Sequence, residues 1–245
     1  MFGKKVHEQN ILEEGHYYIS ISDLMTSLLF IFILILSYVM LSFVKKEKIL
    51  NENIKKIEQN IKSRAQLLEE LKTELVLKNI DVKIDSKNGN MRLKSDLLFK
   101  QGSALISKDG QYQIGEIAKI IVQKMENKNY KDAIDTIFIE GHTDSLPMKT
   151  LNICRTQWTN KELSAQRAIN TYTEMVKVTN AKIKSIKNKK GKHLISYSGY
   201  ADNRPICKEV STMTKKELKI CRAKNRRIEF YFTVNTPEIK KLQEL

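Results

Sequence analysis

Asp23 is a single carboxylate near the start of a long run of uncharged residues. The run comprises residues 19–44, and a helix of this length, at about 1.5 Å per residue, can cross roughly 30 Å of hydrocarbon with some tilt. A carboxylate inside a bilayer costs on the order of 2.5–3.5 kcal/mol, so such groups commonly mark proton or ion pathways. We therefore identify Asp23 as a candidate ion-carrying residue, with the hydroxyls of Ser22 and Thr26 in support. The alternative is that Ser22 and Asp23 cap the helix at the headgroup boundary.

A second pair of reactive side chains is His142 with Asp144 two residues later. A histidine beside a carboxylate could serve a metal site or acid–base catalysis, but both need further ligands or a nucleophile. No second His or Cys stands at ligand spacing in this stretch, and His193 is far away in the sequence. We therefore predict that the chain is not an enzyme and binds no metal or other cofactor.

The apolar run divides the chain into parts of different character. It is too long for the apolar core of a signal peptide, and no small-x-small cleavage site follows it, which predicts a retained signal anchor. We predict a polar tail over residues 1–18, a transmembrane helix over 19–44, a coiled-coil linker over 45–79 and a globular domain over 80–245.

The predicted linker contains no Pro or Gly and is rich in Lys, Glu, Leu and Ile. One stripe of residues alternates in steps of four and three, which is the a/d pattern of a coiled coil. Its members are Leu50, Ile54, Ile57, Ile61, Arg64, Leu68, Leu71 and Leu75. This narrow stripe, broken only by Arg64, predicts a parallel homodimer. The alternative is an amphipathic helix that packs on its own domain.

The globular part alternates strand-like and helix-like segments, which predicts an α+β fold with helices on one face of a small sheet. Strands are expected near residues 91–93, 136–140, 194–198 and 227–234, and helices over 109–126 and 163–178.

Positive charge is concentrated in the same part of the chain. Residues 81–245 hold 32 basic and 18 acidic side chains, an excess of +14. Such a domain suits an anionic partner such as nucleic acid, anionic lipid or cell-wall polymer. Lysines are also denser after the apolar run than before it. The positive-inside rule alone would therefore place the domain in the cytoplasm, where nucleic acid is one alternative partner.

Four short motifs follow one another in the C-terminal part. They are Ile139-Glu-Gly-His-Thr-Asp144, Asn160-Lys-Glu-Leu-Ser-Ala-Gln-Arg-Ala168, Gly199-Tyr-Ala-Asp-Asn-Arg-Pro205 and Asn225-Arg-Arg-Ile-Glu229. Their order and approximate spacing resemble the OmpA C-terminal, peptidoglycan-binding family over roughly residues 90–235. The resemblance implies an OmpA-like α/β sandwich domain that binds the cell wall.

By this resemblance, the ligand is the stem peptide of peptidoglycan, whose diaminopimelate offers an ammonium and a carboxylate. Asp144 at the end of a strand would pair with the ammonium, and Arg167 on the following helix would hold the carboxylate bidentately. The same pocket would include Thr143, Asn160 and Leu163, with Arg226 or Arg227 in support. The alternative is that Asp144 and Arg167 form a purely structural ion pair.

The chain has three cysteines, Cys154, Cys207 and Cys221. In OmpA-like domains a disulfide can occur just before the Asn-Arg-Arg motif, and Cys221 stands at the matching distance from Arg226. The resemblance thus implies a disulfide between Cys207 and Cys221, which would stabilise the domain by about 3 kcal/mol and indicates an oxidising compartment. The alternative is two unpaired buried thiols, and Cys154 is left over in either case.

The segment Ser22-Asp-Leu-Met-Thr26, followed by a linker and a peptidoglycan-binding domain, resembles the B subunits of MotAB-type stators. Residues 18–32 are especially similar to the ZorB subunits of Zorya anti-phage systems, and Leu24 stands where flagellar proteins commonly have Phe. The resemblance implies a proton-driven rotary motor in phage defence. Asp23 would carry the proton, although sodium fits the same residues.

The stator resemblance also implies partners and a location. The partners would be a second copy, joined through the transmembrane helix, linker and C-terminal domain, a pentameric MotA- or ZorA-like membrane subunit, and peptidoglycan, without direct binding of nucleic acid. The chain would cross the bacterial inner membrane once, with its N-terminus in the cytoplasm and its C-terminal domain in the periplasm. Two alternatives are a flagellar or gliding stator subunit and a passive wall anchor of the OmpA or Pal type.

Overall fold

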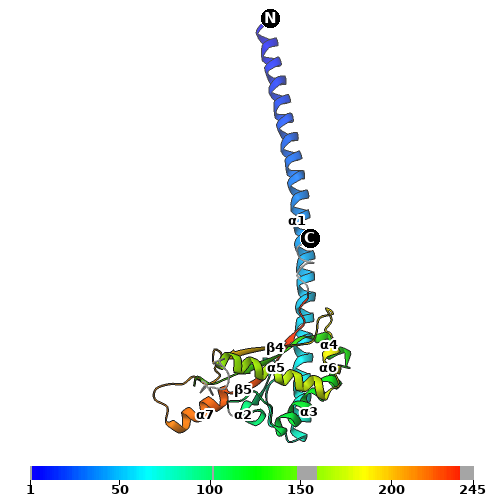
Figure 1. Cartoon of the computed structure of the whole chain (residues 1–245). Helices are drawn as coiled ribbons and strands as arrows, with labels where there is room; N and C mark the ends of the chain where they lie inside the picture. The colour runs from blue at the N-terminus through cyan, green and yellow to red at the C-terminus, as the bar shows by residue number, and fades with distance from the viewer. Residues whose placement is uncertain (1, 101, 148–158, 238–245) are drawn as a thin grey trace. The chain divides into compact units, whose positions relative to one another are not determined.

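A computed structural model describes residues 2–100, 102–147 and 159–237, with side chains described from Ile21 onward (Figure 1). Cys154 lies outside these ranges. The described chain divides into two compact units, residues up to Ile54 and residues 55–237.

The first unit is the N-terminal part of helix α1, which spans Phe2–Leu77. Within the described residues, this is the one helix that is long and apolar enough to cross a membrane. Large apolar side chains are exposed all along it from Leu24 to Val44, and a helix that is apolar all round needs lipid or partner helices around it. Because helical geometry begins at Phe2, Asp23 lies inside the helix. The hypothesis that Ser22 and Asp23 cap its start is therefore wrong.

The second unit is built on a five-stranded sheet with the order β1-β2-β5-β3-β4. The strands are β1 (Lys83–Asp85), β2 (Asn90–Lys94), β3 (Ile134–His142), β4 (Ile195–Ala201) and β5 (Arg227–Val234). Strands β3 and β4 are parallel, and all other neighbours are antiparallel. Alternate residues of β5 face the core, where Ile228, Phe230 and Phe232 are fully buried. This sheet with its helices confirms the predicted α+β fold class.

Six further helices accompany the sheet in the described residues. They are α2 (Ser95–Leu98), α3 (Lys108–Lys124), α4 (Lys128–Ala133), α5 (Asn160–Val178), α6 (Lys182–Ser185) and α7 (Lys215–Asn225). Helix α5 packs on β3, β4 and α3 (Figure 1). Its start is set by a capping box, in which the Thr159 side chain accepts a backbone N–H and the Glu162 side chain reaches back to the Thr159 N–H.

Four leucines at the end of α1 belong to the core of the second unit. All are fully buried: Leu67, Leu68, Leu71 and Leu75. Arg64, which breaks the heptad stripe, is also buried and donates to the backbone carbonyls of Lys87 at 2.8 Å and Phe232 at 3.3 Å. A side chain buried in its own domain cannot pair with a second chain, so the coiled-coil prediction is wrong for this half of the stripe. The compact unit begins at Lys55, inside the predicted linker.

Helix α5 approaches the sheet closely because two strand residues lack side chains. A Cβ atom at Gly141 on β3 would lie closer than 3.0 Å to the Ser164 carbonyl oxygen, and one at Gly199 on β4 would lie equally close to the Ala165 nitrogen. The Ser164 hydroxyl accepts a hydrogen bond from the Ala201 N–H at 3.0 Å. The two glycines therefore set the height of α5 above the ends of β3 and β4.

Replacing Gly141 by alanine should destabilise the domain by about 1–3 kcal/mol, because the new methyl group overlaps the backbone of α5. Gly115→Ala is the matched control, since its Cβ would meet only the flexible Val178 side chain, at 3.2 Å, and alanine is favoured over glycine inside a helix. Chemical denaturation measures both free energies of unfolding. Equal stability of the two variants would contradict the close packing.

Candidate functional site

Charged side chains from four segments meet at one end of the sheet. Asp144 follows β3, Arg226 lies between α7 and β5, Asp96 is in α2, and Arg167 is in α5. Three of these four residues were expected from the sequence. Asp96 was not, because no motif marks it.

Backbone pairing brings these segments together. Strands β3 and β5 are antiparallel, so the end of β3 lies beside the start of β5, with His142 opposite Arg227. The N–H of Ser95, at the start of α2, donates to the Arg226 carbonyl at 3.0 Å. The corner is therefore a consequence of strand order and does not depend on the charges alone.

Arg226 bridges two carboxylates at this corner. Its Nη1 donates to Asp144 Oδ2 at 2.6 Å, while its Nε and Nη2 donate to Asp96 Oδ1 at 2.9 Å and Oδ2 at 2.7 Å. The hydrogen bonds from Arg226 lower the pKa of Asp96, and the hydrogen bonds to Asp96 and Asp144 raise the pKa of Arg226. Asp96 therefore stays ionised at neutral pH and holds the arginine by a two-pronged pair.

Arg167 lies beside this cluster without pairing with Asp144. Its Nε donates to the Ser103 carbonyl at 2.9 Å, and its guanidinium carbon lies 5.1 Å from the centre of the Phe99 ring. Burial lowers the pKa of Arg167 to about 10, although nearby carboxylates oppose the shift. The alternative of a structural Asp144–Arg167 ion pair is wrong, because Arg226 occupies that place. Within the described ranges, neither Nη atom of Arg167 has a hydrogen-bond partner.

The other predicted pocket residues shape the loop that carries Asp144. Asn160 Nδ2 donates to the carbonyls of Asp144 at 3.1 Å and Leu146 at 2.9 Å. Thr143 is buried, and its backbone N–H bonds to the end of β4. Leu163 is also buried, one turn into α5. Asn160 therefore holds the loop after β3 through its side-chain amide, and in this way it orients Asp144.

Arg227 lies on the other face of the sheet, because neighbouring residues alternate along a strand. Its Nε donates to Glu229 Oε2 at 2.8 Å, and its Nη2 donates to the Arg204 carbonyl at 3.1 Å. Arg92 on β2 donates to the other Glu229 oxygen at 2.9 Å. The structure thus places Arg227 in a separate buried cluster, contrary to the prediction that it supports the Asp144 pocket.

His142 belongs to that separate cluster. Its ring stacks on Tyr200 with centroids 5.5 Å apart, and its Nε2 lies 3.4 Å from a Glu140 oxygen and 3.9 Å from a Glu229 oxygen. Neither ring nitrogen has hydrogen-bond geometry with any described residue. Burial lowers the pKa of His142, although Glu140 opposes the shift. The imidazole is therefore neutral at pH 7.

A disulfide and Asn225 fix the turn before β5. The structure joins Cys207 to Cys221, with Cα atoms 5.3 Å apart, which is the pairing that the resemblance implied. Asn225 Oδ1 accepts from the N–H groups of Ile206 at 3.0 Å and Cys207 at 2.9 Å, and its Nδ2 donates to the Cys207 carbonyl at 2.8 Å. Arg226 is the next residue, so these contacts hold its backbone in place.

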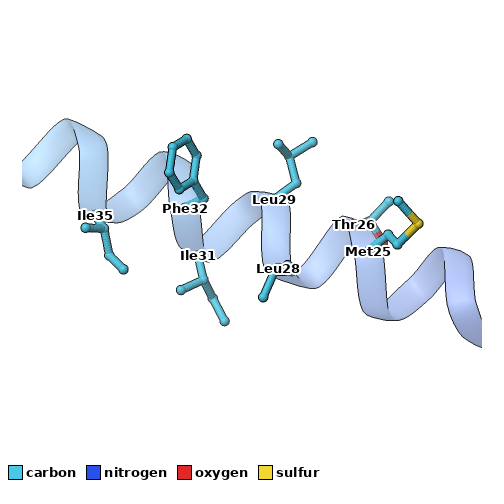
Figure 2. Close-up of a pocket in the computed structure, with 7 residues that line it drawn as sticks. All are labelled: Met25, Thr26, Leu28, Leu29, Ile31, Phe32 and Ile35. Atoms are coloured by element: carbon cyan, nitrogen blue, oxygen red, sulfur yellow. The ribbon is translucent and has the colours of Figure 1, made fainter.

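In the first unit, the hydroxyls near Asp23 bond to the helix backbone. Thr26 Oγ1 donates to the Ser22 carbonyl at 2.9 Å, and Ser27 Oγ donates to the Asp23 carbonyl at 2.7 Å. Across the described part of the chain, no cationic side chain lies within ion-pair distance of the Asp23 carboxylate. Figure 2 shows the following turns, where apolar side chains project to both sides: Met25, Leu28, Leu29, Ile31, Phe32 and Ile35.

Residues 98–217 match the model of the OmpA family, so the chain carries an OmpA-like domain. A protein from Desulfovibrio vulgaris described as MotB-like has the same fold, with a TM-score of 0.53 and 17% identity over 74% of this chain and 98% of that one. The periplasmic domain of Helicobacter pylori MotB is 25% identical over 66% of this chain and 87% of that one, with a TM-score of 0.45.

The cell wall anchor of the type VI secretion system from Pseudomonas aeruginosa is 20% identical, with a TM-score of 0.46 over 70% of this chain and 99% of that one. A comparison with curated proteins finds no match.

The buried His142 should make the domain less stable in acid. The unfolded chain binds a proton at His142 below an ordinary histidine pKa of about 6.5, whereas the folded protein resists it, so the free energy of unfolding falls as pH drops below that value. The slope from this residue is at most about 1.4 kcal/mol per pH unit, the value for one proton bound on unfolding. Urea titrations between pH 7.5 and 5.0 measure it.

His142→Gln keeps a polar side chain without a titrating group and is the control for this slope. The stability of this variant should fall less between pH 7.5 and 5.0 than that of the wild type, even if its stability at pH 7.5 also changes. An unchanged slope would show that other groups cause the acid sensitivity.

Proposed function

We propose that the chain is the B-type subunit of an ion-driven, stator-type membrane motor that is anchored to peptidoglycan. The observation that carries the proposal is that one chain combines an OmpA-like domain with an apolar, membrane-length helix whose carboxylate, Asp23, has no cationic partner among the described side chains. A passive anchor needs only the helix, and a carboxylate there costs about 2.5–3.5 kcal/mol in a bilayer. An ion pathway gives that carboxylate a function.

In this proposal, Asp23 accepts a proton from one side of the membrane and releases it to the other. A charge that crosses 100 mV supplies about 2.3 kcal/mol. The helix from Leu24 to Val44 is apolar on all sides, so partner helices would have to form the polar pathway. We assign these to a second copy of this chain and a pentameric MotA- or ZorA-like subunit. The bare carboxylate suits a proton, and sodium is the alternative ion.

The OmpA-like domain would hold the subunit on the wall through diaminopimelate. Asp144 contributes a carboxylate to the ligand ammonium, and the Nη atoms of Arg167, which have no hydrogen-bond partner among the described residues, contribute donors to the ligand carboxylate. Phe99 and Ser103 keep the Arg167 guanidinium in one position. A fixed acid and a fixed base suit a ligand that carries both charges. The role is binding, without catalysis.

We place the domain in the periplasm and the N-terminus in the cytoplasm. The Cys207–Cys221 disulfide supports this orientation, because disulfides persist in oxidising compartments, and peptidoglycan lies outside the inner membrane. The lysines that follow the apolar run favour the reverse orientation. We give the disulfide more weight because long domains translocate largely regardless of charge.

For the output of the motor we propose anti-phage defence of the Zorya type. The proposal rests on the similarity of residues 18–32 to ZorB subunits, including Leu24 after the aspartate. A flagellar or gliding motor would use the same ion chemistry with a different output.

Asp23→Asn should abolish phage protection in cells that carry the complete system, because the amide cannot take up and release a proton at neutral pH. Ser37→Ala, which removes a polar group from the same apolar run, is the matched control and should protect normally. Immunoblots of membrane fractions check that both variants insert. Full protection by the Asp23→Asn variant would favour a passive wall anchor.

Asp144→Asn and Arg167→Lys should each weaken binding of the full chain to isolated peptidoglycan by about tenfold or more, because the first removes the charge that pairs with the ligand ammonium and the second removes the planar guanidinium that would hold the ligand carboxylate bidentately. Asp135→Asn is the matched control, since Asp135 also pairs with a cation, Lys190 at 3.2 Å, but lies at the opposite end of β3. Sedimentation with sacculi measures binding. Equal binding by all variants would rule out the assigned pocket.

A further inference from the structure

We propose that Asp96 is a positioning residue for the wall-binding site, and that it keeps Asp144 available to the ligand by engaging the Nε–Nη2 fork of Arg226, which leaves Asp144 a single hydrogen bond from that arginine. The inference rests on the proposed binding of peptidoglycan at Asp144 and Arg167. It concerns a residue that touches the ligand site only through another side chain.

The geometry shows two carboxylates that share one guanidinium unequally. Asp96 takes the fork formed by Nε and Nη2, with both of its oxygens engaged, at 2.9 and 2.7 Å. Asp144 receives a single hydrogen bond from Arg226, by Oδ2 at 2.6 Å. Among the residues that the structure describes, its other oxygen, Oδ1, accepts only a long bond from the Leu146 N–H, at 3.3 Å. Asp144 therefore keeps acceptor capacity for an incoming ammonium.

Without the Asp96 carboxylate, the fork of Arg226 would be free to turn onto Asp144. A fork with two parallel hydrogen bonds is the preferred pairing of arginine with a carboxylate. It would occupy both Asp144 oxygens and compete directly with the ligand ammonium. Asp96 prevents this competition because its own oxygens accept both hydrogen bonds of the fork.

Charge balance supports the same role. In the described part of the chain, this cluster contains two acids, Asp96 and Asp144, and two arginines, Arg167 and Arg226, so their charges balance. Arg167 is 4% exposed, and loss of Asp96 would leave it and Arg226 facing one acid. A zwitterionic ligand needs one acid and one base with unused capacity, and excess positive charge would repel its ammonium.

The position of Asp96 is built into the fold. The preceding residue, Ser95, is fully buried, and its N–H donates to the Arg226 carbonyl at 3.0 Å. One residue earlier, Lys94 of β2 pairs with Arg227 of β5. The backbones that carry Asp96 and Arg226 are therefore held in register before their side chains meet, so the fork is more than a surface ion pair formed by chance.

The test is the affinity of the full chain, in detergent, for native sacculi and for sacculi whose diaminopimelate amines are acetylated. Asp96→Asn should weaken binding to native sacculi by about two- to fivefold, a modest effect because the pair is partly exposed. Asp96→Glu, which keeps the charge, should recover part of the loss. Asp135→Asn is the matched control and should bind like the wild type.

The preference for native over acetylated sacculi should also fall in the Asp96→Asn variant, whereas a general loss of structure would lower both affinities together.

A double-mutant cycle shows whether Asp96 acts through Arg226. In an Arg226→Gln background, Asp96→Asn should have no further effect, because no fork is left to hold. An equal loss in both backgrounds, or unchanged binding and preference in the single Asp96→Asn variant, would overturn the inference. If Asp144→Asn abolishes binding while Asp96→Asn does not weaken it, only the role of Asp96 fails. If the wild type does not sediment with sacculi, the wall-binding proposal fails and this inference fails with it.

Discussion

The close approach of α5 to β3 and β4 is the constraint on which the candidate site depends. It requires Gly141 and Gly199, because a side chain at either position would overlap the helix backbone. With the helix at this height, its first residue clamps the loop after β3 and its Arg167 reaches the same corner. A wider spacing between helix and sheet would separate Asp144 from Arg167. The geometry of the pocket therefore depends on how closely the helix packs on the sheet.

The two faces near the start of β5 carry charge for different reasons. Arg226 is partly exposed and lies between the carboxylates of Asp96 and Asp144. In our proposal, Asp144 binds the ligand. Arg227, Glu229 and the neutral His142 are buried on the other face, where Arg227 and the partly exposed Arg92 both pair with Glu229. Removing one partner from such a buried group leaves the other unpaired, which is costly. The first cluster therefore suits exchange with a ligand, and the second suits stability.

In the proposed motor, the two units of the chain have complementary roles in generating force. A carboxylate that passes ions can do work only if its subunit is held still, and the OmpA-like domain would supply that hold. The end of α1 belongs to the domain core through its buried leucines, from Leu67 to Leu75. Helix α1 thus contributes residues to both units. The part of the heptad stripe up to Ile61 does not belong to this core, and its pairing with a second copy stays a prediction.

The sequence by itself determined the features that depend on local pattern. The membrane-length helix, the helices over 109–126 and 163–178, and strand β5 were all predicted, because the spacing of apolar residues close together in the sequence indicates them. Strand β1 and helix α7 were not, since the first is short and the second has few apolar residues. Only the tertiary structure decided that Asp96 and Arg226 surround Asp144, that Arg227 faces the other way, and that the late heptad leucines are core. These facts depend on which strands pair and in what register, and a shift of one residue there moves a side chain to the opposite face.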